Sequence, residues 1–563
     1  MTLENRLPLL LASALTLAAC APASPAAPAQ PAPVPAAVPA AVPAAGAPGG
    51  AAELQPQRGG VFYLGYPRQI PHMYLWENSS PDTQNSLRMA YDTLVNLDFK
   101  PWGDWRTDFR VVPSLAEKWE LKNPTTFVFQ MRQGVKWHDG TPFTAGDVTW
   151  AYEQLRDPAK NFTGRSFLDD LQQVSAPDDR TLEVTTKTPQ VNLLRTLTDY
   201  NLSIMARHAH ERGDNLRQAV VGTGAFKLES FDRQKGLVYV RNDDYWNKPR
   251  PYLDKIHIFT GLDRAAQTAA FFAKQNDAMK VTDKPQLDPI LRSAPDAKSA
   301  PFLRDIESPF VMKLDRPPFN DIRVRQAVHL AIDRQAMIST LTHGTGLANP
   351  PGMNGGRTGW VIPQEELKSL PGWRQPKDQD RAEAKRLLAE AGYGSGLAFS
   401  VLVDKGHTDA SSQVEVISAQ LRTVGIDMKI DITETGVYEK RRADGEFDSW
   451  LGSIARFSPE REWNDFFRTG GRLNQFPIAD PELDRLIEGQ NSEFDEPKRQ
   501  QMWIQIQRLL LKNQYVVPTI TYTNYLIWQP WLLAWVDNFA GQASNVDWSQ
   551  TWLDVAKVPP GRS

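Results

Sequence analysis

The chain changes character near residue 53, and this change limits where a folded body can form. Residues 21–52 are dominated by Ala and Pro. Such a segment has too few large apolar side chains to build a core, and Pro keeps it extended. The folded part must therefore come from residues 53–563, which contain no further long apolar run. That length is too great for one small core, so we expect two lobes.

The residues before this segment are typical of an exported lipoprotein. Arg6 precedes an apolar run over residues 7–19, which is too short to span a membrane. The run ends at Cys20, the only cysteine in the chain. We predict a lipoprotein signal peptide over 1–20, a lipid on Cys20 and an Ala/Pro-rich tether over 21–57. The alternative is an ordinary signal peptide with an incidental cysteine. A body without thiols suits an oxidising compartment.

Composition favours a binding protein over an enzyme. A formal net charge of -3 gives no footprint for nucleic acid or for an anionic membrane surface. The sequence has no Gly-x-Ser-x-Gly or His-Glu-x-x-His motif. His208 and His210 form the only tight histidine pair, a weak metal signal, so we expect no cofactor and no bound metal. The 17 Trp residues suit a pocket for an organic ligand, although most Trp residues in any protein are packing.

Hydrophobic patterns predict a mixed α/β body. Strands are expected over residues 59–65, 127–131, 182–186, 426–430 and 516–522. Helices are expected over residues 144–155, 321–334, 381–391 and 411–424. In the helix after Asp321 we expect Arg323, Arg325 and Arg334 to face solvent. The alternation of helix and strand in the second half favours an α/β lobe.

Three long segments carry a family resemblance. They are residues 112–148, with Trp137-His138-Asp139-Gly140-Thr141-Pro142 at their centre, residues 222–256, and residues 318–334. In these segments the chain resembles the family 5 extracytoplasmic solute-binding proteins of ABC importers, which bind dipeptides, oligopeptides or nickel complexes. Read by themselves, the same residues are structural, because Asp139-Gly140 suits a turn and Gly222-Thr223-Gly224 lacks the rest of a phosphate-binding motif.

The resemblance implies an α/β clamshell of the type II periplasmic-binding-protein class. Lobe one would comprise residues 58–305 and 516–563, with an extra subdomain near 100–218, and lobe two residues 306–515. A solute would bind in the cleft, and a hinge motion would close the lobes. The implied partners are a small-molecule solute and the ABC permease subunits, and we expect a monomer held at the membrane by its lipid.

One segment departs from the peptide-binding members. Their acidic residue for the peptide amino terminus aligns with Arg456, which would repel an ammonium and could hold a carboxylate or phosphate. The alternative is that Arg456 pairs with Glu460 or Glu462 at the rim. A simple peptide, a chelated metal and a chemosensory role without transport stay open. The further candidate ligand contacts are Phe457, Trp463, Tyr74, Trp76, Met353, Asn354, Tyr522 and Asn524.

Overall fold

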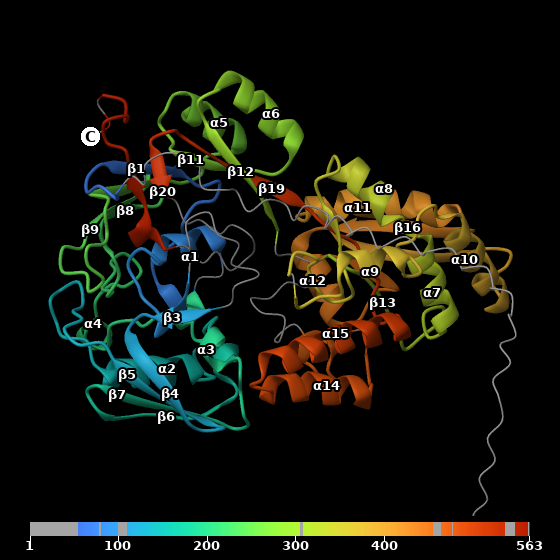
Figure 1. Ribbon diagram of the computed structural model, residues 1–563, viewed down its shortest axis with the longest axis horizontal. Coiled ribbons are helices and arrows are strands. Elements are labelled where there is room, and N and C mark those ends of the chain that lie inside the picture. Colours follow the sequence, from blue (N-terminus) through green and yellow to red (C-terminus); the bar gives the residue numbers. More distant parts are fainter. Residues whose placement is uncertain are drawn as a thin grey trace, which may run out of the picture. The chain divides into compact units, whose positions relative to one another are not determined.

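The computed structural model describes residues 55–77, 80–98, 110–304, 308–357, 359–453, 463–475, 477–534, 547–560 and 562. Figure 1 shows these residues as a coloured ribbon. The predicted signal peptide, Cys20 and nearly all of the predicted tether lie outside the described residues, as do Arg456 and Phe457.

A seven-stranded sheet joins the first half of the chain to its C-terminal part. The predicted first strand is confirmed as β1 (Val61–Gly65) and lies in the middle of this sheet, parallel to both β10 (Lys255–Phe259) and β11 (Ala278–Val281). β19 (Thr523–Trp528) comes almost 220 residues after β12 (Lys298–Leu303) in the sequence. It inserts between β11 and β12 and is antiparallel to both. The spatial order of the strands in the sheet is β12 (Lys298–Leu303), β19 (Thr523–Trp528), β11 (Ala278–Val281), β1 (Val61–Gly65), β10 (Lys255–Phe259), β9 (Gly236–Arg241) and β8 (Phe226–Asp232).

A separate antiparallel sheet contains the predicted strands near 127–131 and 182–186, which are both confirmed. Its order is β4 (Ala116–Asn123), β5 (Thr126–Met131), β7 (Thr181–Thr186) and β6 (Leu171–Asp178). The predicted helix beside it is α2 (Ala145–Arg156), which begins with a capping box between Thr144 and Asp147. The cap satisfies backbone donors that the first helical turn leaves free.

The motif residue His138 links two segments of the first half. Its Nε2 lies 3.1 Å from the carbonyl oxygen of Gly224, and its Nδ1 accepts from the Gly222 amide at 3.3 Å. A Cβ on Gly222 would lie 1.7 Å from the Ala90 carbonyl oxygen, so only glycine fits. Burial lowers the pKa of His138 to about 4. The structural interpretation of both motifs is therefore confirmed.

The second half forms an α/β sheet. The order is β13 (Phe310–Met312), β17 (Ser449–Leu451), β15 (Leu397–Asp404) and β16 (Ile426–Thr433). β15 is parallel to β16 and to β17, whereas β13 at the edge is antiparallel to β17. α11 (Thr408–Arg422) and α12 (Thr435–Ala443) both pack against β15. Of the late strand predicted over 516–522, only Ile520–Thr521 forms a named strand, β18, which pairs with β14 (Leu347–Ala348); β19 begins just after the predicted range.

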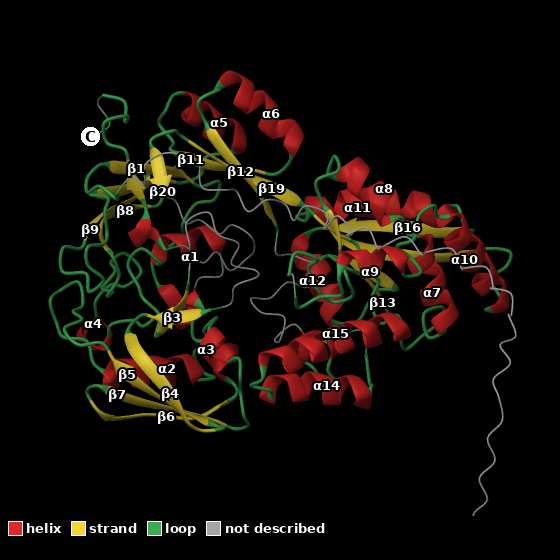
Figure 2. Ribbon diagram, in the orientation of Figure 1, coloured by secondary structure: helices red, strands yellow, loops and turns green. Residues whose placement is uncertain are grey.

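Helices cover both α/β regions, as Figure 2 shows. In the first region they are α1 (Pro81–Leu87), α2, α3 (Leu193–Thr196), α4 (Arg207–Arg212), α5 (Arg264–Phe272) and α6 (Lys284–Ser293). In the second they are α7 (Ile322–Ala331), α8 (Arg334–Leu341), α9 (Gln364–Ser369), α10 (Asp378–Glu390), α11 (Thr408–Arg422), α12 (Thr435–Ala443), α14 (Pro481–Ser492) and α15 (Glu496–Asn513). Two more strand pairs are β2 (Val95–Leu97) with β3 (Val111–Pro113), and β20 (Leu532–Ala534) with β21 (Trp552–Leu553).

The helix predicted after Asp321 is two helices, and two of its arginines are buried. Asp321 caps α7 as expected, but α7 ends at Ala331 and Asp333 caps a new helix, α8. Arg325 is 8% exposed and Arg334 is 2% exposed, so the prediction that they face solvent was wrong. Helical spacing failed because both guanidinium groups find carbonyl oxygens inside the protein, which offsets the cost of burying a charge.

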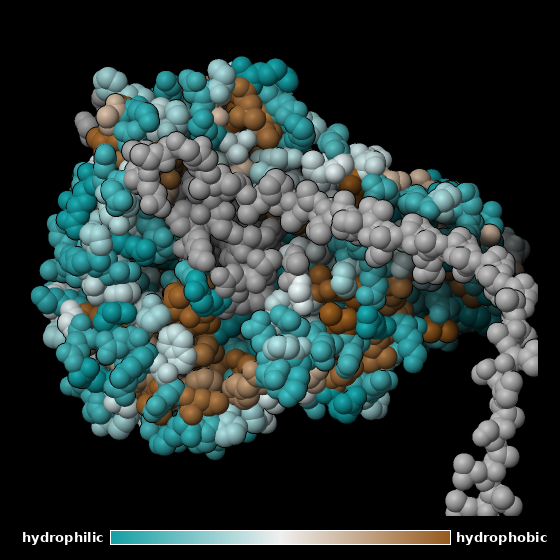
Figure 3. All heavy atoms as spheres, viewed as in Figure 1, coloured by the Kyte–Doolittle hydropathy of each residue, from teal (hydrophilic) through white to brown (hydrophobic). Residues whose placement is uncertain are grey.

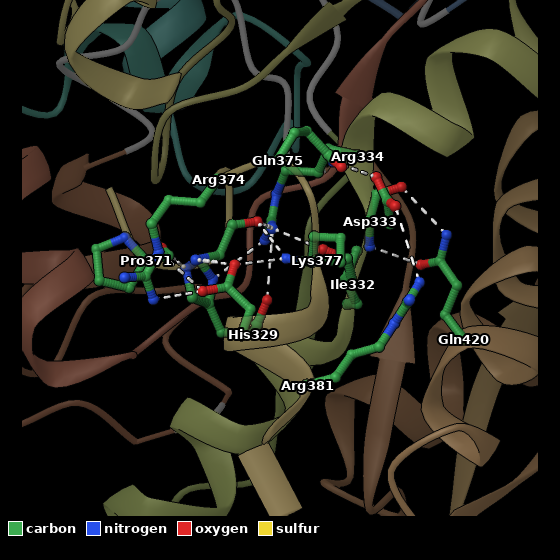
Figure 4. Close-up of polar contacts among 12 residues, drawn as sticks. His329, Ile332, Asp333, Arg334, Pro371, Arg374, Gln375, Lys377, Arg381 and Gln420 are labelled. Atoms are coloured by element: carbon green, nitrogen blue, oxygen red, sulfur yellow. Dashed lines mark hydrogen bonds and ion pairs between the residues drawn. The ribbon is translucent and has the colours of Figure 1, made fainter. Parts of the chain in front are cut away.

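Figure 4 shows the polar contacts around Arg334. Its Nε donates to the Pro518 carbonyl oxygen at 2.8 Å and its Nη1 to the Gly372 carbonyl oxygen at 2.7 Å. Its Nη2 lies 3.1 Å from His329 Nδ1, and His329 Nε2 lies 3.0 Å from the Pro371 carbonyl oxygen. Because a carbonyl only accepts, the proton of His329 sits on Nε2, and Nδ1 accepts from Arg334.

A buried ion pair completes this cluster. Lys377 donates to Asp380 Oδ2 at 2.8 Å and to the Gly372 carbonyl oxygen at 3.0 Å. Asp380 is fully buried and also accepts from Arg374 and from the Gly372 amide. We call His329, Arg334, Gly372, Lys377 and Asp380 the Arg334 cluster. It ties α7, α8 and the start of α10 to the segment before β18.

The surface in view is mostly hydrophilic, with scattered hydrophobic patches (Figure 3). Within the described ranges, no helix has the length and apolar character needed to cross a membrane.

Candidate ligand-binding site

The chain passes between the two α/β sheets at the carboxyl ends of their parallel strands. In the seven-stranded sheet, β1, β10, β11 and β12 end at one edge, where β19 begins. In the second sheet, β15, β16 and β17 end at the edge where β13 begins. Ligands of open α/β sheets bind outside the carboxyl ends of strands. We call Arg304, residues 308–309 before β13, and the return connection over 518–522 the crossing region.

Arg304 is the first residue after β12 and contacts several parts of the crossing region. Its backbone amide donates to the Tyr522 carbonyl oxygen at 3.0 Å, and its carbonyl oxygen accepts from Asn354 Nδ2. Its guanidinium pairs with Asp409 in the first turn of α11. Burial lowers the pKa of Arg304. One residue therefore connects both crossing connections to the second sheet, and it brings together two of the predicted ligand contacts, Asn354 and Tyr522.

The first turn of α11 adds further polar groups. His407 is the N-cap residue, but its side chain makes no capping hydrogen bond. Its Nδ1 is buried without a hydrogen-bond partner among the described residues. Burial, with a smaller effect of the Arg304 charge, lowers the pKa of His407 to about 4. The Tyr522 hydroxyl lies 3.5 Å from the Asp409 carbonyl oxygen, and burial raises its pKa to about 12. The site thus presents a neutral imidazole and an un-ionised phenol beside an ion pair.

Asn524 lies at the same edge on the other side of the crossing region. It is 2% exposed. In the amide orientation that satisfies its neighbours, Nδ2 donates to the Thr282 carbonyl oxygen at 3.0 Å and Oδ1 accepts from Lys280 Nζ at 3.3 Å. Asn524 therefore contacts two residues at the carboxyl end of β11.

Tyr74 and Trp76 belong to an aromatic cluster in the first region. Trp76 is buried and donates through Nε1 to the Ser203 carbonyl oxygen at 3.3 Å. Its ring lies 5.4 Å from Phe162 and 5.9 Å from Trp150, and Tyr74 lies 6.0 Å from Phe162. Trp76 is held by packing, whereas Tyr74, Trp150 and Phe162 stay partly exposed. These three could contribute a flat apolar surface to a ligand.

Two predicted contacts are core residues. Trp463 is fully buried, donates through Nε1 to the Gly352 carbonyl oxygen at 3.3 Å, and has its ring 4.6 Å from that of Trp503. Met353 is 1% exposed and belongs to the same cluster. Both are packed in this cluster, and whether either contacts a ligand stays a prediction. No signal in the sequence distinguishes such a core Trp from one that faces a ligand.

Sequence reasoning missed a polar groove of about 720 Å³. One wall comes from residues 166–199 and the other from residues 464–492, and the Val191 amide donates to the Asn491 carbonyl oxygen at 2.9 Å. Charged residues of both signs line it, among them Asp169, Lys187, Arg468 and Glu488. No motif marks these residues, because their segments are far apart in sequence. Nowhere in the described ranges do three or more His, Asp or Glu residues form a group that could hold a metal ion.

Comparisons with known proteins agree on one family. Residues 110–467 match the profile of the bacterial extracellular solute-binding proteins, family 5 Middle. The periplasmic oligopeptide-binding protein OppA of Salmonella typhimurium is 26% identical over 454 residues, which cover 75% of this chain and 81% of OppA. Heme-binding protein A of Haemophilus influenzae is 25% identical over 407 residues, which cover 65% of this chain and 69% of that protein.

Solved structures give the same picture for the fold. The binding protein AgaA from A. tumefaciens R10, in complex with agropinic acid, superimposes with a TM-score of 0.69 at 22% identity. The superposition covers 88% of this chain and 99% of AgaA. At this level of identity the likeness shows the fold alone.

Proposed function

This chain belongs to the bacterial extracellular solute-binding proteins of family 5, and from this premise we propose where and what it binds. Its fold is the two-lobed α/β clamshell of periplasmic binding proteins. It serves an ABC importer outside the cytoplasm, where it captures a small solute and delivers it to the permease. Its activity is binding, and we assign it no catalytic step.

We place the solute at the crossing region. The observation that carries this placement is topological, since the carboxyl ends of the parallel strands of both sheets lie where the chain crosses. Asn354, Tyr522 and Asn524 stand at this place with Arg304 and His407. Hinge motion about the two crossing connections would bring the lobes together on the solute, so binding would shift the population toward the closed form.

The solute we propose is anionic. Arg456, in the stretch that follows β17, would hold a carboxylate or phosphate with its two-pronged guanidinium. Phe457 and Tyr74 would pack on the remainder. The relatives differ in what their names say they bind, an oligopeptide in one case and heme in another. Membership of the family therefore leaves the ligand open, and a peptide is the second candidate because OppA is among the relatives.

Calorimetry with dipeptides and with acidic organic solutes tests this proposal. We expect acidic solutes to bind and Arg456→Ala to weaken them at least tenfold. Arg323→Ala, at a partly exposed position where the guanidinium pairs with Asp321, is the matched control and should bind as the wild type does. Tight binding of dipeptides that persists in Arg456→Ala would show that the solute is a peptide and would contradict the proposal of an anionic solute.

We also propose that a lipid on Cys20 anchors the protein and that residues 21–57 act as its tether. The support is the small-residue run before a single cysteine at the end of a short apolar segment. Metabolic labelling with a fatty acid tests it, with Cys20→Ser as the matched variant. Label that persists in the variant, or a soluble wild-type protein, would contradict the anchor. We propose a monomer, which light scattering of the variant without lipid would check.

A further inference from the structure

Two segments from distant parts of the chain contact each other across the polar groove, between α3 and α14 (Figure 1). The Val191 amide donates to the Asn491 carbonyl oxygen at 2.9 Å. Ser492 Oγ donates to the Pro189 carbonyl oxygen at 3.3 Å, although these two residues are 303 positions apart in the sequence. We call Pro189, Val191, Asn491 and Ser492 the groove contact.

The two sides of the groove contact belong to different hydrophobic cores. Leu193, the first residue of α3, is buried in the same cluster as residues of β1 and β10. Leu483 and Ile487 of α14 are buried in a separate cluster, together with Trp503. The groove contact therefore joins two bodies that each have a core of their own.

A hydrogen-bond network holds the end of α14 in place. Trp503 Nε1 donates to Gln490 Oε1 at 3.0 Å, and Gln490 Nε2 donates to Asn491 Oδ1 at 2.5 Å. Asn491 Nδ2 donates in turn to Asn464 Oδ1 at 3.2 Å. The last four carbonyl oxygens of a helix have no donor within that helix, and the carbonyl oxygen of Asn491 is one of them. This side of the groove contact therefore offers a fixed acceptor to a donor from outside α14.

The other side of the groove contact is a tight turn. The Leu193 amide donates to the Gln190 carbonyl oxygen at 3.2 Å, and Asn192 has φ -87 and ψ -1, the values of the third position of a type I turn. Val191 therefore occupies the second position, which proline favours. A turn of this type uses the amide of its fourth residue, so the Val191 amide is left to donate to Asn491.

Charged side chains of the groove have partners on their own side of it. Arg468 pairs with Glu488 at 3.3 Å and Arg472 pairs with Asp465 at 2.9 Å, all within the wall formed by residues 464–492. Separation of the two walls breaks neither of these pairs. It does break the hydrogen bonds of the groove contact, and because water replaces them, each changes a population by only about fivefold. The groove contact can therefore form and break.

We propose that the groove contact is a latch that stabilises the closed form of the clamshell. This inference rests on the proposed function and concerns how the same binding site closes. The hydrogen bonds of the latch exist only while the two walls are together, so they raise the population of the closed form. A solute binds more weakly when the form that binds it is rare. The latch therefore also raises the apparent affinity for the solute.

Distances between two spin labels, measured by electron resonance, test the latch without any solute. The labels go on Glu120→Cys in β4 and Arg485→Cys in α14, both exposed positions, in a Cys20→Ser chain that has no other thiol. Val191→Pro removes the amide donor and fits the turn, whereas Val191→Ala keeps the donor and is the matched control. We expect the ratio of short to long distances to fall about fivefold in Val191→Pro and to hold in Val191→Ala.

Ser492→Ala removes the second hydrogen bond of the latch. Because that bond is longer, at 3.3 Å, the ratio should fall in the same direction but by less than in Val191→Pro. The melting temperature shows whether Val191→Pro folds, and if it does not, Ser492→Ala decides alone. Distances that match those of Val191→Ala in every folded variant would overturn the latch. A labelled chain with an intact latch that shows only the long distance would overturn it as well.

Calorimetry of the unlabelled wild type with succinate and with L-alanyl-L-alanine tests the proposed function separately. A probe that binds should bind several-fold more weakly to Val191→Pro and equally well to Val191→Ala. Equal affinity in the two variants would overturn the latch and leave solute binding intact. Suppose instead that the distances respond to Val191→Pro, but the protein binds neither probe and carries no small molecule after purification. That result would support the latch and count against the proposed function.

Discussion

The Arg334 cluster and the crossing region both hold a buried arginine, but they satisfy it differently. Arg334 donates to carbonyl oxygens of Pro518 and Gly372 and to His329, and the nearby carboxylate of Asp380 has three donors of its own. Arg304 has a carboxylate partner, Asp409, yet beside it His407 Nδ1 is buried without a partner among the described residues. A network with every group paired fixes a structure, whereas unpaired groups beside a charge are free to meet a ligand.

The pKa values follow the same division. Burial lowers the pKa of Arg334 to about 9 and that of Lys377 to about 8, which shows how far the cluster is removed from water. Both still lie above neutral pH, so the two groups stay charged and keep their hydrogen bonds. At the crossing region, burial instead leaves His407 neutral and Tyr522 un-ionised. Substitutions in the Arg334 cluster should therefore lower stability, whereas substitutions in the crossing region should weaken binding.

Arg334→Met gives the largest expected loss of stability. The substitution leaves the Pro518 carbonyl oxygen buried without its donor, removes one of two donors from the Gly372 carbonyl oxygen, and takes away one of the positive charges near Asp380. We expect the free energy of unfolding in urea to fall by about 3–5 kcal/mol, the range for breaking a buried charged network. Arg323→Met, at a partly exposed position, should cost much less, because an exposed ion pair contributes little to stability. Equal losses in the two variants would mean that the buried contacts of Arg334 contribute no more than the exposed pair of Arg323.

Gly372→Ala should have the next largest effect. Gly372 has φ +92, and a Cβ there would lie 2.1 Å from His329 Nε2. The alanine must strain its backbone and also displace the imidazole from Pro371. Together these effects should cost about 2–3 kcal/mol in urea unfolding. Gly392→Ala is the matched control, since Gly392 has φ +87 but no atom within 4 Å of the added Cβ. It should lose only the backbone part, about 1 kcal/mol. If Gly372→Ala lowers the free energy of unfolding no more than Gly392→Ala does, the imidazole of His329 can move aside without loss of stability.

The sequence was sufficient for the architecture and insufficient for both arginine environments. Strand and helix patterns predicted β1, α2, α10 and α11, because each buries one face of regular spacing. The same helical spacing wrongly predicted that Arg334 faces solvent. Its carbonyl partners at Pro518 and Gly372 come from segments that no local pattern connects to α8. For the site, Tyr522 and Asn354 were predicted and do meet at Arg304, although whether they contact a solute stays a prediction.

Acidification should lower stability through His407 by a smaller amount. Its folded pKa of about 4 lies below the ordinary 6.5, so the unfolded chain binds more protons between these values. Stability therefore falls as pH falls below about 6.5. From pH 7 to pH 5.5 the contribution of His407 should be about 1 kcal/mol. His407→Gln should reduce the pH dependence of urea unfolding by this amount relative to the wild type. An unchanged pH dependence in the variant would show that His407 is not held neutral by burial.

Tyr522→Phe should have the smallest effect on stability and a clear one on binding. The contact of the hydroxyl with the Asp409 carbonyl oxygen is long, at 3.5 Å, so losing that contact should change the free energy of unfolding by about 0.5 kcal/mol or less. If the solute uses this hydroxyl, its affinity in calorimetry should fall about tenfold, the cost of one hydrogen bond in a buried site. The control is Tyr515→Phe, which removes a 2.9 Å bond to Asp480 outside the crossing region and should reduce stability without changing affinity. Should Tyr522→Phe prove as costly to folding as Tyr515→Phe while affinity is unchanged, the crossing region would resemble the Arg334 cluster and the solute would have to bind elsewhere.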